Sequence, residues 1–509
     1  MKKPAGIADA LTVRSAPSAS GAVSTPSREI RGRILHGTLA RLFGRAVGGV
    51  LSLVALHFAT RYFGPRAWGP VVTAVSLFTI FSAIGDFGAG RIVSREVARV
   101  EGDSATAYGT SLVAGSVLGA VAAVGLVAVA ALLYFSRATT LLYVLALSPG
   151  VLFTAWWQTS ASVLTGRERN DVRAVLDFAS SALLLGGVFV VIGARLGGMG
   201  YVVASTVAVA VTAFVSLVLA ARHVRPSWDF GRADVKRFAR QSVPVGASLM
   251  LYALYLRVGV VLLTFFRGEK TVGVYGVAVQ LALFVMSAPG FLMGAVLGPF
   301  MRADRQERHA LSQHALALLV SVSLPIPVFL ALFGHGFVLM LSGRAFTGAV
   351  HPLVVLGVAC TIWYVNAGLL DLAVNEGGEH RVLRPLTVSA LFSVAAALVA
   401  VPFFGMEGAA FVIVVTEVLN LVQYLRLYHS MTGFAPDLRG LVPAVAATVV
   451  LAGVAALVVH AGGVRVSDGP ALVGQVCAAV AVYAAALVVT RRMAGGTGGR
   501  RRPRAPVEP

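Results

Sequence analysis

The stretch QSVPVGASLMLYALYLRVGVVLLTFF, residues 241–266, is apolar almost throughout and carries a single charged residue, Arg257, in its interior. A helix of this length measures about 39 Å, and the hydrocarbon core of a bilayer is about 30 Å thick. The stretch therefore predicts a transmembrane helix. Arg257 lies well inside it, where a charged side chain costs about 2.5–3.5 kcal/mol or more. We expect its guanidinium to face a polar cavity or a buried partner rather than lipid.

The composition of the whole chain is that of a polytopic membrane protein. Of its 509 residues, 57% are hydrophobic and 13% are charged, whereas soluble domains carry about 25% charged residues. The net charge of +20 would suggest nucleic acid as the partner of a soluble protein. Here the basic residues flank apolar segments, so we expect topology and anionic membrane lipid to explain them, and no nucleic-acid partner. Cys360 and Cys477 both lie in apolar segments and indicate neither a disulfide framework nor a metal site.

Fourteen hydrophobic segments predict an all-α membrane fold. The basic tails, residues 1–36 and 491–509, are expected to be disordered. The segments are residues 37–61, 67–90, 108–134, 139–165, 173–194, 199–221, 241–266, 272–300, 310–333, 348–374, 385–403, 407–428, 440–461 and 470–490.

The distribution of lysine and arginine predicts the orientation of these segments. With the N-terminus inside, the cytoplasmic connections and tails hold 31 basic residues and the outer loops hold 8. Cytoplasmic loops carry the excess of basic residues, so both termini are predicted to be cytoplasmic in a multi-pass protein of the plasma membrane. The outer loops are short, and no G-x-x-x-x-G-K-[ST] sequence is present. We therefore predict a protein that is not an enzyme and that hydrolyses no nucleotide.

An internal repeat divides the chain. The turn RYFGPRAWGPV (61–71) resembles FFRGEKTVGVYGVA (265–278) at an offset of 207 residues, and VLTGRERNDVRAV (163–175) resembles VNEGGEHRVLRPL (374–386) at an offset of 211. Chance similarity between apolar segments is the alternative explanation. The repeat predicts two six-helix lobes with a binding site between them near mid-membrane. The expected parts are an N-lobe, a cytoplasmic linker, a C-lobe and two additional helices, at residues 37–221, 222–240, 241–430 and 440–490.

The block LHFATRYFGPRAWGPVVTAVSLFTIFSAIGDFGAGRIVSREVAR (56–99) resembles the opening of polysaccharide flippases of the multidrug/oligosaccharidyl-lipid/polysaccharide exporter superfamily. The shared pattern is an aromatic-Gly turn, then Trp/Tyr-Gly, Asp-x-Gly and a basic helix. LTGRERN (164–170) and DVKRFARQSVPVGAS (234–248) fit the same family. The resemblance covers about residues 37–430 and implies two lobes that alternate access to a central cavity. It also implies transport of an undecaprenyl-type lipid-linked oligosaccharide to the outer leaflet, for cell-surface polysaccharide biosynthesis.

Arg257 is the first candidate for a substrate-binding residue. A lipid-linked sugar carries a diphosphate, and arginine offers planar donors that suit phosphate oxygens. The alternative is a structural ion pair with Glu417, which lies in the middle of segment 407–428 with Asn420 on its face. The two interpretations are compatible if an Arg257–Glu417 ion pair opens when an anionic headgroup binds. We therefore place Arg257, Glu417 and Asn420 among the substrate-binding residues.

The first two segments add candidates for the cavity and for a gate. Arg45 and Ser52 share one stripe of segment 37–61 and would line the cavity, although Arg45 equally fits an anchor that reaches the membrane surface. Asp86 and Arg91, at the cytoplasmic end of the next segment, resemble gate residues where the lobes touch. An ordinary charged pair at the end of a helix is the alternative for them.

Two residues are candidates for coupling transport to an ion. His57 could carry a proton, although a histidine packed against its neighbours is the simpler interpretation. Asp371, near Glu376, offers a cation site or an interfacial charge balanced by Arg381 and Arg384. The sequence contains no metal-ligand cluster and no cofactor motif. It leaves open whether protons or sodium ions drive the cycle.

A cation-coupled multidrug exporter of the same fold is the alternative function. The six predicted segments of the N-lobe contain only two carboxylates, Asp86 and Asp177, which favours an anionic substrate. We expect a monomer whose partner is the lipid-linked glycan itself. A polysaccharide polymerase and glycosyltransferases are candidate protein partners.

Overall fold

The computed structural model consists of helices over the residues that it describes. Eleven of these helices are long and apolar enough to cross a membrane. Two of them bend at a glycine with positive φ: Gly64 (φ 69°) in α1, Arg28–Asp86, and Gly405 (φ 58°) in α13, Glu379–Thr432. Each bend divides its helix into two crossings, and the shorter apolar stretch Val442–Val454 adds another. The described chain thus confirms the predicted fold of about fourteen crossings. The described residues are 28–99, 103–229, 231–301, 303–437, 441–461 and 471–498.

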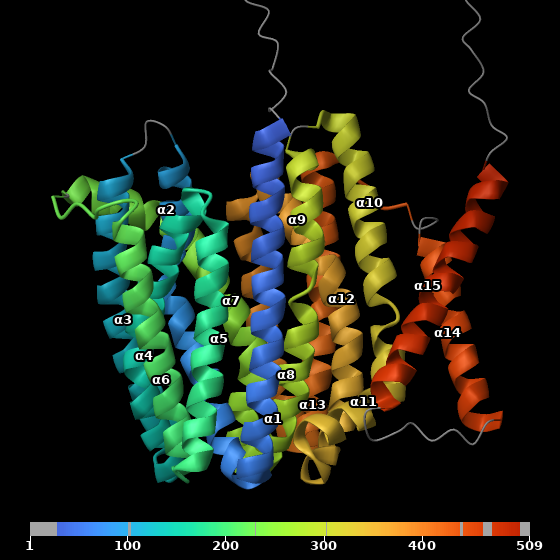
Figure 1. Cartoon of the computed structure of the whole chain (residues 1–509), viewed down its shortest axis with the longest axis horizontal. Helices are drawn as coiled ribbons and strands as arrows, with labels where there is room; N and C mark the ends of the chain where they lie inside the picture. The colour runs from blue at the N-terminus through green and yellow to red at the C-terminus, as the bar shows by residue number, and fades with distance from the viewer. Residues whose placement is uncertain are drawn as a thin grey trace, which may run out of the picture.

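Helices α3 to α6 lie together on one side of the molecule, and α1 runs between them and the second half (Figure 1). Within this first lobe α4 packs against α3 and α6, and α5 packs against α1. The helices after α1 are α2 (Ala89–Ala98), α3 (Ser104–Tyr134), α4 (Ala138–Gly166), α5 (Asn170–Gly193) and α6 (Gly197–Ala221).

The second lobe is built around α13, which packs against α7 and α12. Helices α14 (Val442–Ala461) and α15 (Ala471–Gly498) cross each other at its edge (Figure 1). The two lobes and the two C-terminal helices were predicted, whereas the exact residue bounds of each lobe stay a prediction. The other elements are α7 (Arg232–Arg267), α8 (Glu269–Met286), α9 (Pro289–Phe300), α10 (Arg305–Ser323), α11 (Ile326–Ser342), the 3-10 helix η1 (Arg344–Ala349) and α12 (Val350–Asn375).

At the end of the molecule remote from Arg28 and Gly498, the lobes touch backbone to backbone. A Cβ added to Gly69 would overlap the carbonyl oxygen of Glu269, and one added to Gly273 would overlap that of Pro65. Thr73 Oγ1 lies 2.7 Å from Thr264 Oγ1 in the same interface. The contact therefore joins the two turns that the sequence repeat relates. We call it the glycine interface.

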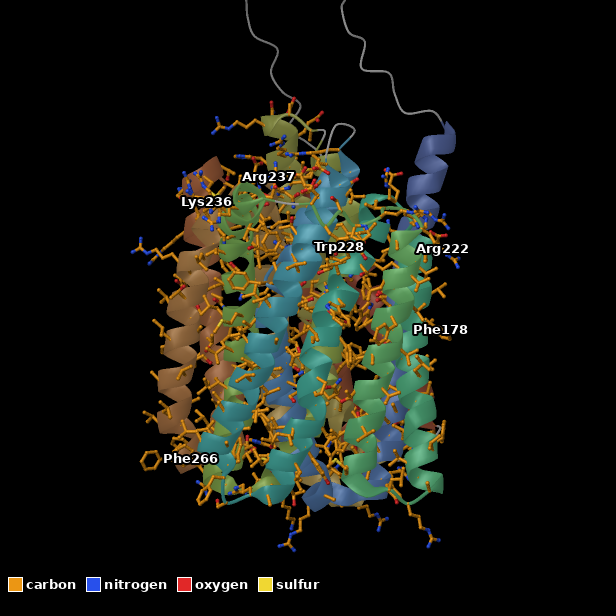
Figure 2. All side chains as sticks on the ribbon, turned by 90° about the vertical axis from the view of Figure 1, so that its left-hand side faces the viewer. Phe178, Arg222, Trp228, Lys236, Arg237 and Phe266 are labelled. Atoms are coloured by element: carbon orange, nitrogen blue, oxygen red, sulfur yellow. The ribbon has the colours of Figure 1, made fainter. Side chains whose placement is uncertain are left out.

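The opposite end carries the described ends of α1 and α15 (Figure 1). There the lobes meet at the break between α1 and α2, where Phe87 (φ 38°) packs against Gly246 of α7. Arg95 of α2 also forms an ion pair of 2.8 Å with Glu379 of α13. Nitrogen-bearing side chains gather at this end, as Figure 2 shows, with Arg222, Lys236 and Arg237 among them. We call it the basic end.

Candidate functional site

A cavity of about 240 Å³ lies between the lobes. Both halves of α1 and residues of α4, α5 and α6 form one wall, and α7 and α8 form the other. The lining residues are Ser52, Leu56, Trp68, Val71, Val72, Val75, Phe78, Leu147, Gly150, Leu184, Tyr201, Ser205, Thr206, Val209, Arg257, Gly276 and Gln280. The cavity lies where the repeat predicted a binding site.

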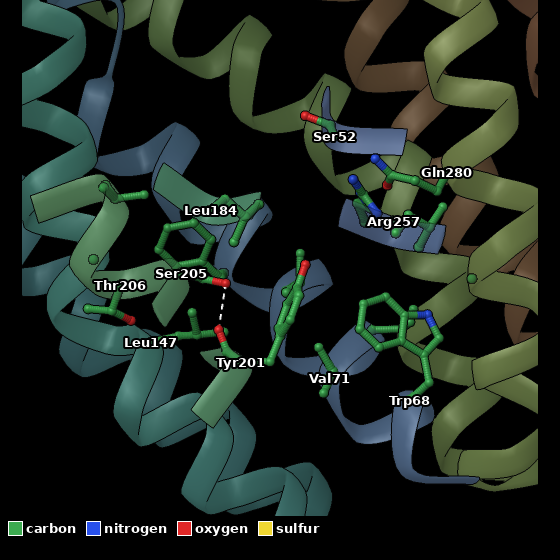
Figure 3. Close-up of a pocket in the computed structure, with 17 residues that line it drawn as sticks. Ser52, Trp68, Val71, Leu147, Leu184, Tyr201, Ser205, Thr206, Arg257 and Gln280 are labelled. Carbon is green, nitrogen blue, oxygen red and sulfur yellow. Dashed lines mark hydrogen bonds between the residues drawn. The ribbon is translucent and has the colours of Figure 1, made fainter. Parts of the chain in front are cut away.

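Arg257 supplies the charge of this cavity. Its guanidinium lies beside Gln280 of α8, with Ser52 of α1 nearby (Figure 3). Among the side chains that the structure describes, none forms a hydrogen bond or an ion pair with Arg257. A half-buried arginine fork with free donors in a cavity is suited to bind an anion, because a charge withdrawn from water without a counter-ion is unfavourable.

The facing wall combines aromatic rings with hydroxyl groups. The rings of Trp68 and Tyr201 meet edge to face with centroids 5.2 Å apart. Ser205 donates to the Tyr201 carbonyl at 2.8 Å, so its own oxygen can still accept (Figure 3). Such a wall offers an apolar face and hydrogen-bonding groups to one ligand, as in small-molecule sites generally. A sugar ring presents the same combination of C–H faces and hydroxyls.

A family model described as "Polysaccharide biosynthesis protein" matches residues 34–303, just over half of the chain. The chain belongs to the polysaccharide biosynthesis protein family. A search among curated proteins returned no match.

Solved structures show the same fold as this family member. "Lipid II flippase MurJ, inward closed conformation" superposes with a TM-score of 0.74 at 13% identity, over 90% of this chain and 99% of that one. The "MATE multidrug transporter DinF-BH in complex with R6G" superposes with a TM-score of 0.61 at 17% identity, over 80% of this chain and 97% of that one. An outward-facing "multidrug resistance MATE family transporter of the MOP superfamily" superposes with a TM-score of 0.57 at 15% identity, over 79% of this chain and 96% of that one. At these identities the likeness concerns the fold alone. The family member therefore has the architecture of a multi-pass membrane transporter.

Glu417 and Asn420 do not line the cavity of this family member, which corrects their assignment as cavity residues. Both are fully buried inside the second lobe. Glu417 accepts hydrogen bonds from the Tyr255 hydroxyl (3.1 Å) and from Asn366 Nδ2 (2.7 Å). Arg257 follows Tyr255 by two positions, and residues at that spacing point to different sides of a helix. The expected Arg257–Glu417 pair is therefore absent.

The Glu417 network yields a stability prediction. Asn366→Ala removes a donor from a fully buried carboxyl group, and an unsatisfied buried group costs about 1–3 kcal/mol, more if charged. We expect a clearly lower midpoint of thermal unfolding in detergent. Asn375→Ala is the control, because the Asn375 amide bonds only to the Asp371 carbonyl near a helix end. A midpoint unchanged by Asn366→Ala would refute the structural role of the network.

The charged contact between the lobes at the basic end is not the predicted one. Asp86 ends α1, and its Oδ1 is buried without a hydrogen-bond partner among the described residues. Arg91 instead lines a larger hollow of about 690 Å³ together with Asp371. The ion pair across the lobes joins Arg95 and Glu379, one turn farther along α2. A gate role for Asp86 and Arg91 therefore stays a prediction.

His57 belongs to a helix cap and not to the cavity. Its Nδ1 lies 2.8 Å from the Leu341 carbonyl, and Arg61 donates to the Leu339 and Met340 carbonyls at 3.2 and 3.1 Å. These carbonyls belong to the last turn of α11, whose groups have no partner within the helix. This geometry supports the interpretation of His57 as a histidine packed against its neighbours, one of the two that the sequence offered.

The neighbourhood of Asp371 also differs from the expectation. Glu376 pairs with Arg308 of α10 at 3.1 Å, and not with Arg381 or Arg384. Asp371 itself lines the hollow at the basic end, and the described residues contain no group of three or more His, Cys, Asp or Glu side chains that could hold a metal ion. A coupling role for Asp371 stays a prediction.

Of the other predicted cavity residues, Ser52 lies in the lining. The side chain of Arg45 falls outside the described residues. Sequence reasoning missed Gln280, Tyr201 and Ser205. Gln280 had a usable signal, because it is a polar residue in the middle of segment 272–300. Tyr201 and Ser205 had none, since hydroxyl-bearing residues are common in membrane helices.

Proposed function

We propose that this protein is a flippase that moves an undecaprenyl-type lipid-linked oligosaccharide from the inner to the outer leaflet of the plasma membrane. The single observation that carries the proposal is Arg257, a guanidinium with free donors in a cavity between the two lobes. A diphosphate offers planar sets of oxygens that match the arginine fork and neutralise its charge. The sugar would then lie against Trp68 and Tyr201.

Alternating access accounts for the two contacts between the lobes. The lobes touch at the glycine interface towards one end of the molecule and at the Phe87–Gly246 contact towards the other. A cavity of about 240 Å³ is much smaller than a lipid-linked oligosaccharide, so the lobes must separate to admit one. The excess of basic residues supports a cytoplasmic location for the basic end. Substrate would enter from the inner leaflet and leave when the glycine interface opens.

A cation-coupled exporter of drugs fits this cavity less well. The lining contains one cation and no carboxylate, so a cationic drug would meet repulsion and no counter-ion. The deciding experiment reconstitutes the purified protein in proteoliposomes and measures two transports side by side. We expect inner-to-outer movement of an undecaprenyl diphosphate sugar and no uptake of the cationic dye rhodamine 6G. Dye transport without movement of the lipid-linked sugar would overturn the proposal.

A further inference from the structure

A second hollow between the lobes lies at the basic end, outside the central cavity. It is a groove of about 560 Å³ between α2, α7 and α13, and it therefore spans both lobes. Five of its lining residues are arginine, lysine or histidine, and one is acidic. We call it the basic groove; its charged or titratable residues are Arg95, Lys236, Arg237, Arg240, His380 and Glu379.

Two of the three cations that α7 contributes to this groove have no acidic partner among the described side chains. Lys236, Arg237 and Arg240 are exposed and lie within the first three turns of α7, at spacings of three and four that place them on one face. Arg237 has a contact of 3.5 Å with Asp234. Lys236 and Arg240 have no acidic partner among the described side chains.

The helix dipoles make this arrangement unfavourable for the protein alone. The N-terminus of a helix is its positive end, and anions are stabilised there whereas cations are not. Both α7, which begins at Arg232, and α13, which begins at Glu379, present this end to the groove. Cations concentrated at two positive helix ends are explained by an anion that binds between them.

The position of the groove fits the phosphate level of the membrane. Trp228, 65% exposed on the connection before α7, lies towards the same end of the molecule as Lys236 and Arg237, whereas Phe266 marks the other end (Figure 2). Exposed tryptophans favour the boundary between acyl chains and headgroups. The groove is also continuous with the 690 Å³ hollow, because Arg95, Val245 and Glu379 line both.

We infer that the basic groove is the loading site for the diphosphate of the lipid-linked substrate, and that the bound diphosphate separates Arg95 from Glu379. The inference rests on the proposed function, since it assigns the first step of the same transport. The Arg95–Glu379 pair is the ionic contact between the lobes at the basic end. Releasing it when substrate arrives would let the lobes part towards the hollow and the central cavity.

The ion pair is suited to this exchange. The Arg95 side chain is 62% exposed and that of Glu379 30%, and exposed ion pairs contribute little net stability. A diphosphate carries more charge than one carboxylate and offers several acceptors to arginine. It would also gain Lys236 and Arg240, which the carboxylate of Glu379 leaves free. Glu379 therefore competes with substrate for Arg95.

Binding of farnesyl diphosphate to the full-length protein in detergent tests the site. We expect Lys236→Gln/Arg240→Gln to weaken binding at least tenfold. The control Arg222→Gln/Arg225→Gln removes the same charge from two exposed arginines outside the groove, at the same end, and should stay within twofold of wild type. Glu379→Gln should tighten binding several-fold, because it removes the competitor for Arg95. A merely structural ion pair predicts no such gain.

A distance measurement tests the separation of the lobes. Spin labels at Ala98→Cys in α2 and Arg384→Cys in α13 report the distance between the two lobes. The exposed Cys477 is replaced by serine, whereas the native Cys360 is buried and can stay. Farnesyl diphosphate should lengthen this distance, and farnesol, which lacks phosphate, should not. Glu379→Gln should lengthen it without ligand.

Other outcomes would overturn the inference about the basic groove and leave the proposed function unaffected. Equal binding of inorganic pyrophosphate, or of phosphatidylglycerol vesicles, would show general anion adsorption instead of a site for a lipid-anchored diphosphate. Loss of farnesyl diphosphate binding in Arg257→Ala but not in Lys236→Gln/Arg240→Gln would place the phosphate in the central cavity only. If the wild type moved no lipid-linked sugar in proteoliposomes, the proposed function would fail whatever the groove binds.

Discussion

Arg257→Ala should abolish movement of the lipid-linked sugar to the outer leaflet while leaving the protein at least as stable as wild type. Losing a desolvated partner of a phosphate group costs about 2–5 kcal/mol of binding, which corresponds to a transport rate lower by about thirtyfold to several thousandfold. The free protein loses only a charge without a counter-ion, so its midpoint of thermal unfolding should stay equal or rise. Exposure of the sugar at the outer surface of cells measures the first effect.

Two further variants sharpen this test. Arg257→Lys keeps the charge but loses the planar fork, so we expect intermediate transport. Arg344→Ala is the matched control, because Arg344 is exposed and its side chain forms no hydrogen bond or ion pair with another described residue. Normal transport in both Arg257→Ala and Arg257→Lys, at normal abundance, would remove Arg257 from the mechanism.

A single methyl group in the glycine interface should stop the transport cycle. In Gly69→Ala or Gly273→Ala, the added Cβ would overlap a carbonyl oxygen of the other lobe, and backbone cannot move aside as a flexible side chain can. The variants should remain open at this end, with transport at least tenfold lower. Thr73→Cys, fully buried when the interface is closed, should then react with a membrane-impermeant thiol reagent.

The control for the glycine variants is Gly294→Ala. Gly294 lies in α9 with no atom close to the position of an added Cβ, so the same substitution should be neutral or slightly stabilising. Thr73→Cys should remain protected in that background. Protection of Thr73→Cys in Gly69→Ala as well, with full transport, would show that the two lobes do not close through this contact.

The match between the repeat and the glycine interface shows how far sequence reasoning reached. The repeat was found in the turns at 61–71 and 265–278, and these turns contact each other in the fold. Loop residues carried the signal because the composition of an apolar helix hides it. The close approach of Gly69 and Gly273 could not be predicted from the sequence. Other glycines of the chain, such as Gly294, have no neighbouring atom close to the position of a Cβ, and the sequence does not distinguish the two kinds.

The side-chain partners were the least predictable part of the protein. His57 was expected either to pack against its neighbours or to act in transport, and it caps a helix that lies 284 residues away in the chain. Arg95 and Glu379 are separated by the same number of residues. Their pairing depends on which helices become neighbours across the lobes, and no local pattern encodes that choice.

The sequence by itself determined the helices, their approximate number and the need for a cavity at Arg257. Each of these follows from a local balance: a span must satisfy its own backbone hydrogen bonds, and an interior charge cannot face lipid. Only the tertiary structure decided that Tyr255 faces Glu417 whereas Arg257 faces the cavity. The rotation of α7 about its axis makes that difference. Packing against α13 and α1 sets the rotation, and a residue two positions along the helix then meets a different environment.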